Sequence, residues 1–247
     1  MTAGQIHVGT SGWHYDHWVG PFYPEGLSSA DFLAYYVQHF RSVELNSTFY
    51  HLPKPATVAA WSERTPADFV FTCKASRYIT HMKKLKDPQA SIARFFEVIA
   101  ALRGKLGAIV FQLPPRWHVD LPRLQAFLAA LPDGYRYAFE FRDESWFGTP
   151  TYEALARCNA AFCIYDLARH LSPLEVTANF VYVRLHGPDG PYCGEYGQRA
   201  LRGWARRCRT WAGQGRDVFF YFDNDEAGYA ASDALRLCRM LELPSDG

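Results

Sequence analysis

The chain has 247 residues, a formal net charge of +1, 49% hydrophobic residues and 21% charged residues. This is the balance of an ordinary globular protein, with no overall charge that would attract nucleic acid or an anionic membrane. No run of eighteen apolar residues occurs, and the first residues lack a basic and apolar leader, so neither a transmembrane helix nor a secretory signal is expected.

Eight short apolar runs of strand type recur along the chain. They occupy residues 6–10, 42–46, 69–75, 108–113, 135–141, 161–166, 180–186 and 217–223. Amphipathic helical patterns follow most of them, at residues 28–40, 87–104, 120–132, 149–158, 199–212 and 227–241. The sixth connection, residues 167–179, is too short and too interrupted by proline for a good helix.

This alternation predicts one α/β domain over residues 1–247. The simplest architecture is a (β/α)8 TIM-type barrel with an irregular sixth β-to-α connection. A doubly wound open sheet would require a GxGxxG loop after the first strand, and the GTSGW found there does not have that spacing.

The cysteines indicate the redox setting. Six occur, without a CxxC or a zinc-binding spacing. Cys73 and Cys163 lie inside apolar strand runs, where a reduced thiol packs as a small hydrophobic group. We therefore expect a reducing, cytoplasmic location.

Polar side chains interrupt the strands near their carboxyl ends, although parallel strands covered on both faces are usually apolar throughout. Counting by twos along each strand places these side chains on one face, which we expect to line the barrel at its C-terminal mouth. The set is Glu44, Asn46, Lys74, Gln112, Glu140, Arg142, Arg184, His186, Tyr221 and Asp223. The flanking residues are apolar and suit packing under helices.

An unpaired buried charge costs several kcal/mol, while a whole domain is stable by about 5–15 kcal/mol. These charges must therefore be paired with one another, hydrated in a cavity, or both. One interpretation is an ion-pair plug, in which Glu44 neutralises Lys74 and Glu140 neutralises Arg142. The favoured interpretation is a site for a polar ligand, because barrel interiors usually close with branched apolar residues.

Six sequence blocks resemble one known family. They read GTSGWHYDHWVGPFYP, VELNSTFYHLP, FTCKASRYITH, IVFQLPP, AFEFRDESW and YVRLHG. In this order they resemble the YecE-like proteins, domain of unknown function family 72, over nearly the whole chain. The resemblance implies a (β/α)8 barrel and supplies no reaction.

The chain departs from that family near its end. The family pattern favours an asparagine pair after the eighth strand and another asparagine in the next helix. Here the stretches read YFDNDEAG and AASDA, with Asp223 and Asp233. This argues against a role that needs a neutral amide at position 223.

The residue types at the mouth suggest acid/base chemistry on a small, polar and anionic ligand, such as a phosphorylated, carboxylated or sugar-like molecule. Arginine and lysine would bind the anion, carboxylates would act as acid or base, and the histidine would move protons. The candidate catalytic residues are Glu44, Lys74, Glu140 and His186. The candidate ligand-binding residues are Trp13, Tyr15, Asn46, His81, Gln112, Arg142, Arg184, Asp223 and Asn224.

Other functions are compatible with the sequence. Glu140, Asp166 and His186 form an oxygen and imidazole set for a divalent metal, as in a metal-dependent hydrolase, phosphodiesterase or isomerase, although no cofactor is favoured. A glycosidase would use Glu44 and Glu140. Lys74 is compatible with Schiff-base chemistry, but a salt bridge is the favoured role for it.

A non-catalytic module that binds a small molecule or nucleic acid is the contrasting class. An arginine stripe over residues 199–209 would suit nucleic acid, but a solvated helix face explains it better.

Overall fold

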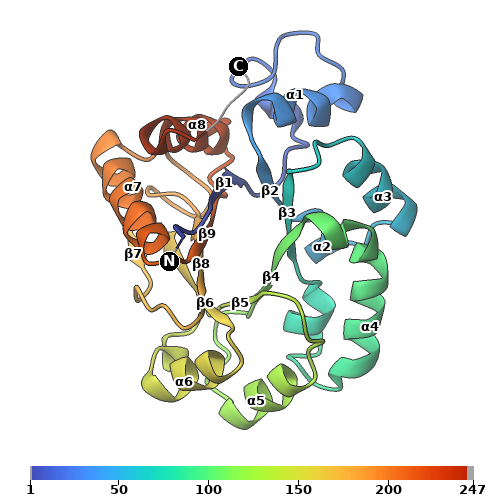
Figure 1. Cartoon of the computed structure of the whole chain (residues 1–247), viewed down its shortest axis with the longest axis vertical. Helices are drawn as coiled ribbons and strands as arrows, with labels where there is room; N and C mark the ends of the chain where they lie inside the picture. The colour runs from blue at the N-terminus through green and yellow to red at the C-terminus, as the bar shows by residue number, and fades with distance from the viewer. Residues whose placement is uncertain (1, 244–247) are drawn as a thin grey trace.

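The structure, a computed structural model, describes residues 2–243, and these form one barrel-shaped sheet surrounded by helices (Figure 1). Its parallel strands are β1 (Ile6–Thr10), β2 (Ser42–Leu45), β3 (Val70–Lys74), β4 (Leu106–Gln112), β5 (Tyr137–Glu140), β6 (Ala161–Leu167), β8 (Phe180–Leu185) and β9 (Asp217–Phe222). They are ordered β1-β9-β8-β6-β5-β4-β3-β2, and the two-residue β7 (His170–Leu171) pairs antiparallel with β6.

The end strands of this order, β1 and β2, meet through a parallel bridge between Ser11 and Glu44. The Gly12 amide also donates to the Glu44 carbonyl oxygen at 2.8 Å. These contacts bring the sheet nearly to closure, so the predicted (β/α)8 barrel class is confirmed. The predicted domain limits, residues 1 and 247, lie outside the described residues.

Helices follow the strands around the barrel (Figure 1). The predicted ones appear as α1 (Phe32–His39), α4 (Pro88–Ile99), α5 (Leu121–Ala129), α6 (Thr149–Arg157), α7 (Gln198–Gly213) and α8 (Tyr229–Leu241). Short 3₁₀ turns cover Asp16–Trp18, Ser29–Asp31, Ala100–Lys105 and Glu144–Trp146. Residues 168–179 contain no helix, as predicted for the sixth connection.

Three helical segments were not predicted from the sequence: α2 (Ser47–Tyr50), α3 (Pro55–Glu63) and a π-helix at Tyr78–Met82. Two of them are only four or five residues long, too short to show a helical period. The third, α3, buries only Val58. It therefore lacks the apolar stripe by which the longer helices were recognised.

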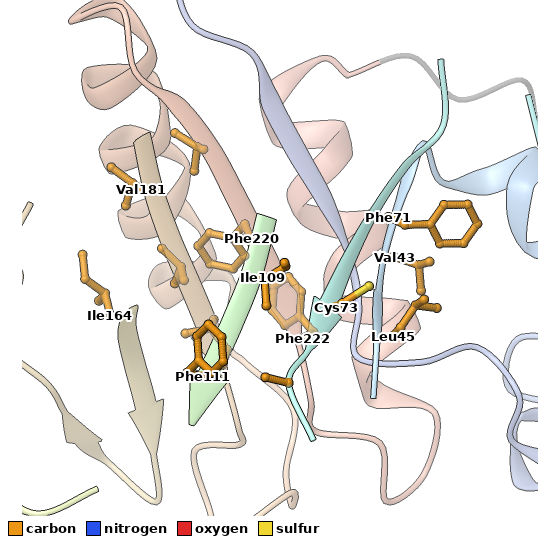
Figure 2. Close-up of a cluster of buried hydrophobic side chains, with 14 of the residues drawn as sticks. Val43, Leu45, Phe71, Cys73, Ile109, Phe111, Ile164, Val181, Phe220 and Phe222 are labelled. Atoms are coloured by element: carbon orange, nitrogen blue, oxygen red, sulfur yellow. The ribbon is translucent and has the colours of Figure 1, made fainter. Parts of the chain in front are cut away.

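The main core lies between the outer face of the strands and the helices. The apolar side chains that flank the polar positions belong to it, and Figure 2 shows several of them, among them Val43, Leu45, Phe71, Phe220 and Phe222. The inward positions therefore belong to the barrel interior, as the alternation predicted.

A second apolar cluster fills the lower part of the barrel interior. Strands β4, β5 and β6 contribute small residues, and β8 and β9 contribute large aromatic ones. Small side chains opposite rings suit the tapering space of a small barrel. The set is Ala108, Val110, Ala138, Ala161, Cys163, Phe180, Tyr182, Phe219 and Tyr221. Above this layer the polar side chains begin.

The seam between β1 and β2 depends on the small size of Gly9. A Cβ atom at this position would lie 2.1 Å from the Ser42 carbonyl oxygen. We expect Gly9→Ala to destabilise the protein by about 1–3 kcal/mol or more, as overpacking does. Gly213→Ala is the control: a Cβ there has no atom within 4 Å, and the helical position should gain about 0.4–1 kcal/mol. Urea unfolding measures the stability of both variants. Equal stability would contradict the claim that the contact between β1 and β2 requires a glycine at position 9.

Candidate functional site

Arg184 on β8 lies at the centre of the polar side chains. Its guanidinium donates to Glu44 and Glu140 at 2.7 Å and to Asp223 at 3.0 Å. The side chains of Arg184, Glu44 and Glu140 are fully buried, and that of Asp223 is 4% exposed. One cation thus joins carboxylates from β2, from β5 and from the residue after β9.

Glu44 faces the closed lower side of this network. The Ser11 hydroxyl donates to its Oε1 at 2.5 Å, and the Tyr182 hydroxyl donates to its Oε2 at 2.6 Å. The Tyr182 oxygen also lies 3.0 Å from the Thr72 hydroxyl. With Arg184 on the remaining side, the carboxylate is fully hydrogen-bonded within the protein, so this layer is a dry ion-pair layer.

His186 sits above Arg184 and is also fully buried. Its Nε2 lies 2.8 Å from Arg142 Nη2, and its Nδ1 lies 2.9 Å from Asp223 Oδ2. The Nδ1 atom faces the Asp223 carboxylate, and Nε2 also lies 3.3 Å from Glu140 Oε1. Both ring nitrogens are therefore engaged by protein groups.

The surrounding cations control the acidity of the carboxylates. Burial alone would raise the pKa of Glu140, but Arg142, Arg184 and His186 together hold it well below its usual value. Arg142 pairs directly with Glu140. Arg184 and His186 likewise lower the pKa of Asp223 against the opposing effect of burial. Both groups are carboxylates at neutral pH.

Lys74 on β3 differs from the other charged residues. It is 3% exposed, and its ammonium lies 4.1 Å from the centroid of the Phe49 ring. It forms no ion pair or hydrogen bond with any described side chain, so the favoured expectation of a salt bridge is wrong. The physical reason is that Glu44, its expected partner, is turned toward Arg184. Burial, with Arg184 nearby, lowers the pKa of Lys74 to about 8.

His81 marks a positively charged corner of the mouth next to Lys74. It belongs to the π-helix after β3 and packs edge-on against Phe49 at 5.1 Å. Its pKa falls to about 4, first through burial and then through the charges of Lys74, Arg77 and Arg142. The structure therefore brings Lys74, His81 and Arg142 into one neighbourhood.

Gln112 is the last residue of β4, and Asn46 directly follows β2 at the mouth. Gln112 is 8% exposed, and its side-chain nitrogen donates to the Leu113 carbonyl at 3.2 Å. The Asn46 Oδ1 atom is buried and has no hydrogen-bond partner among the described residues. A buried acceptor without a partner costs about 1–3 kcal/mol, which makes Asn46 a candidate ligand contact.

Two residues of the aromatic loop after β1 were ligand-binding candidates, and they have different surroundings. The Tyr15 hydroxyl donates to the Ser11 carbonyl at 2.7 Å, and the pKa of Tyr15 is raised by burial and by the charges of Asp223, Asp225 and Glu44. Trp13 instead meets Trp61 of α3 edge-on at 5.2 Å.

Asn224 lies outside the cluster. Its side-chain nitrogen donates to Asp233 of α8 and to the Gly194 carbonyl, both at 2.8 Å. It therefore ties the loop after β9 to α8. Of the ligand-binding candidates, it is the one that the structure turns away from the mouth.

The side chains of the alternative metal set do not form a site. Glu140 and His186 lie 3.3 Å apart, but Glu140 is paired with Arg142 and Arg184, and His186 contacts Arg142 and Asp223. Asp166 has a buried Oδ1 without a described partner. Within residues 2–243, no three His, Cys, Asp or Glu side chains are placed to hold a metal ion.

Three participants were missed from the sequence: Ser11, Tyr182 and the π-helix. Tyr182 lies two residues before Arg184, so the period-two rule extended by one step would have placed it on the inner face. Ser11 directly follows β1, and the same rule extended past the end of that strand would have placed it on the inner face. The π-helix has no such signal, although π-helical turns occur frequently at functional sites.

The chain is similar to proteins of one family. The family model described as protein of unknown function DUF72 matches residues 7–247. The YunF protein of Bacillus subtilis is 28% identical, with an alignment that covers 98% of this chain and 96% of that protein. The YecE protein of Escherichia coli K12 is 34% identical over 58% of this chain and 50% of its own length.

Solved structures agree with the fold. A DUF72 family protein from Thermotoga maritima superposes with a TM-score of 0.88 at 30% identity, covering 96% of this chain and 99% of that one. One from Enterococcus faecalis reaches 0.83 at 19% identity, with 97% and 96% coverage, and shows the fold alone. No helix within residues 2–243 is both long and apolar enough to cross a membrane.

Removal of the central guanidinium tests the network. We expect Arg184→Met to destabilise the protein by about 3–5 kcal/mol, because it leaves buried carboxylates without their shared partner. The control is Arg157→Met, which removes a largely exposed pair with Glu153 at 3.4 Å and should cost less than about 0.5 kcal/mol. Denaturant unfolding compares them, and similar losses in both variants would count against a central role for Arg184.

The depressed pKa of Glu140 predicts a pH dependence of stability. A carboxyl whose pKa is lower in the folded protein stabilises it above the unfolded pKa, and this contribution is lost as the pH falls through the folded value. The difference in unfolding free energy between wild type and Glu140→Gln should therefore shrink as the pH falls below 4.5, the ordinary pKa of a glutamate carboxyl. The exposed Glu153→Gln serves as the control, with a small difference that changes little. A Glu140→Gln difference that stays constant from about pH 6 to 3 would exclude the assignment.

Proposed function

Because the chain belongs to the family described as protein of unknown function DUF72, whose description states no reaction, we propose its function from the side chains at the mouth. The protein is an enzyme that performs acid/base chemistry on a small anionic molecule, with Lys74 exchanging the proton. The observation that carries this proposal is a buried lysine whose ammonium has no carboxylate partner among the described residues.

A lysine in this environment is suited to proton transfer. Its pKa of about 8 means that the amine and the ammonium are both populated near neutral pH. General acid/base catalysis is most efficient when the pKa of the group lies near the working pH. Lysine is also the cation whose pKa shifts most readily on burial, whereas arginine stays protonated.

The neighbours of Lys74 favour an anionic ligand. Arg142, with a side chain 11% exposed, borders the same corner together with His81. The three carboxylates of the network are turned toward Arg184, Arg142 and His186. An anion bound at this corner would supply the direct ion-pair partner that the described residues do not give to Lys74, and Arg142 would add directed donors.

The other catalytic candidates act indirectly in this proposal, by holding in place the side chains that contact the ligand. Glu44, Glu140 and His186 are fully buried, and their polar atoms are engaged within the protein. In this proposal they are positioning residues. Glu44 and Glu140 hold Arg184, and Glu140 and His186 orient Arg142 toward the ligand.

The acidity of Lys74 is directly measurable. In protein labelled with ¹³C-lysine, we expect one Cε signal to titrate at about pH 8 and to move to higher pH when inorganic phosphate is added. The signal should be absent in Lys74→Met and retained in Lys86→Met, which removes an exposed lysine of the connection between β3 and α4. A protein in which every lysine titrates near 10.5, or in which phosphate moves no signal, would contradict the proposal.

A separate experiment distinguishes an enzyme from a binding module. Native mass spectrometry of freshly purified wild type identifies any retained anion, which Lys74→Met should lack. Incubation of that compound with wild type in D₂O should convert it or exchange its hydrogen for deuterium. Binding without either change would identify a binding module.

A further inference from the structure

A cavity of about 600 Å³ adjoins the mouth on the side of β1 and β2. Residues 12–15 after β1, the start of α1, the turn α2 and the helix α3 surround it. Its lining is mainly apolar and aromatic, with a few polar groups. Sites for small molecules in proteins have this size and this composition.

The aromatic side chains of the cavity favour a flat ligand. Trp13 and Trp61 meet at an interplanar angle of 89°, so their indoles form two walls at a right angle. Tyr50 also lines the cavity and is 55% exposed, which leaves its ring available for contact. Aromatic rings stack on or pack edge-to-face against such surfaces, and the contacts are worth about 0.5–1.5 kcal/mol beyond the buried area.

The turn α2 connects this cavity with the amine of Lys74. Phe49 faces the ammonium at 4.1 Å, and the ring of Tyr50 lies 5.0 Å from the ring of Phe49. Together the two distances limit the separation between the Lys74 ammonium and the Tyr50 ring to 9.1 Å. This span is comparable to the length of a small aromatic molecule. Neither Lys74 nor Phe49 lines the cavity, so a ligand that touches both Tyr50 and Lys74 must extend from the cavity past the Phe49 ring.

Asn46 supplies a polar contact between the two regions. It lines the cavity, and it is the residue that follows β2, two positions beyond Glu44. Its buried Oδ1 has no hydrogen-bond partner among the described residues. A ligand N–H or O–H group placed at this point would satisfy the acceptor.

We propose that the cavity binds the aromatic part of the ligand, and that the anionic group of the same molecule reaches Lys74. The substrate class is thus an aryl anion, an aromatic ring carrying a phosphate or a carboxylate. This inference rests on the proposed function and deepens it. Trp13 and Trp61 hold the ring. Asn46 accepts a hydrogen bond from an N–H or O–H group of the ligand that lies between the ring and the acidic group.

The test uses three probes: 1-naphthyl phosphate, 1-naphthol and inorganic phosphate. Calorimetry and intrinsic tryptophan fluorescence measure their binding to the wild-type protein. We expect naphthyl phosphate to bind about tenfold or more tightly than phosphate, because ring contacts add to the anion contacts. Naphthol, which lacks the anionic group, should bind more weakly than naphthyl phosphate.

Two variants locate the ring. Trp61→Ala removes one wall, and Ala30→Trp places a bulky side chain at the edge of the cavity. Both should reduce naphthyl phosphate binding to the level of phosphate while phosphate binding stays unchanged, which also shows that the variants are folded. Ala156→Trp on the exposed face of α6 is the matched control and should bind naphthyl phosphate as wild type does.

The possible failures are distinguishable. Phosphate binding without any gain from the naphthyl ring would overturn this inference and leave the proposed function in place. Equal binding of naphthyl phosphate by wild type and by both cavity variants would do the same. Failure of phosphate itself to bind the wild type would contradict the proposed function and, with it, the aryl anion.

Discussion

The burial of the Arg184 guanidinium is the constraint on which the mouth of the barrel depends. A charge without access to water is tolerated only when paired groups surround it, and here three carboxylates do so. Glu44 comes from β2, Glu140 from β5 and Asp223 from the end of β9, so one cation joins distant parts of the barrel wall. The network therefore stabilises a particular arrangement of strands as well as a charge.

This pairing divides the mouth into two layers with different chemistry. Below Arg184, tyrosine, serine and threonine hydroxyls complete the hydrogen bonding, and the layer is dry. Above it, Lys74 and His81 lie without carboxylate partners among the described residues, and Arg142 borders them. The ion-pair plug and the ligand site, which were alternatives at the level of sequence, are thus compatible with each other: the plug is the lower part of the mouth, and the proposed ligand site lies above it. The plug fixes the positions from which the upper side chains act.

The strands and the inward positions followed from sequence because the side of a strand on which a residue lies is set by local backbone geometry. The choice of partners followed only in part. Glu140 pairs with Arg142, two residues further along the chain, as the ion-pair-plug interpretation had it, but pairing between strands depends on side-chain reach across the barrel. The ion-pair-plug interpretation paired Glu44 with Lys74 on the neighbouring strand, but Arg184 on β8 pairs with Glu44 instead. The contacts of Asn224, a ligand-binding candidate, were not predicted for a related reason. Its side-chain nitrogen donates to Asp233 of α8, and the strand pattern carries no information on where that helix packs.

The position of Lys74 follows from the same competition. With the carboxylates committed to arginine, the ammonium rests against the Phe49 ring, which attracts a cation without neutralising it as a carboxylate would. A lysine held by a ring remains able to lose its proton, whereas a salt bridge would favour the charged form and raise its pKa. Because Phe49 belongs to the four-residue turn α2, and Tyr50 of that turn lines the neighbouring cavity, one short element both holds the amine and borders the proposed ring site. Motion of this turn would therefore alter the acidity of Lys74 and the shape of the cavity together.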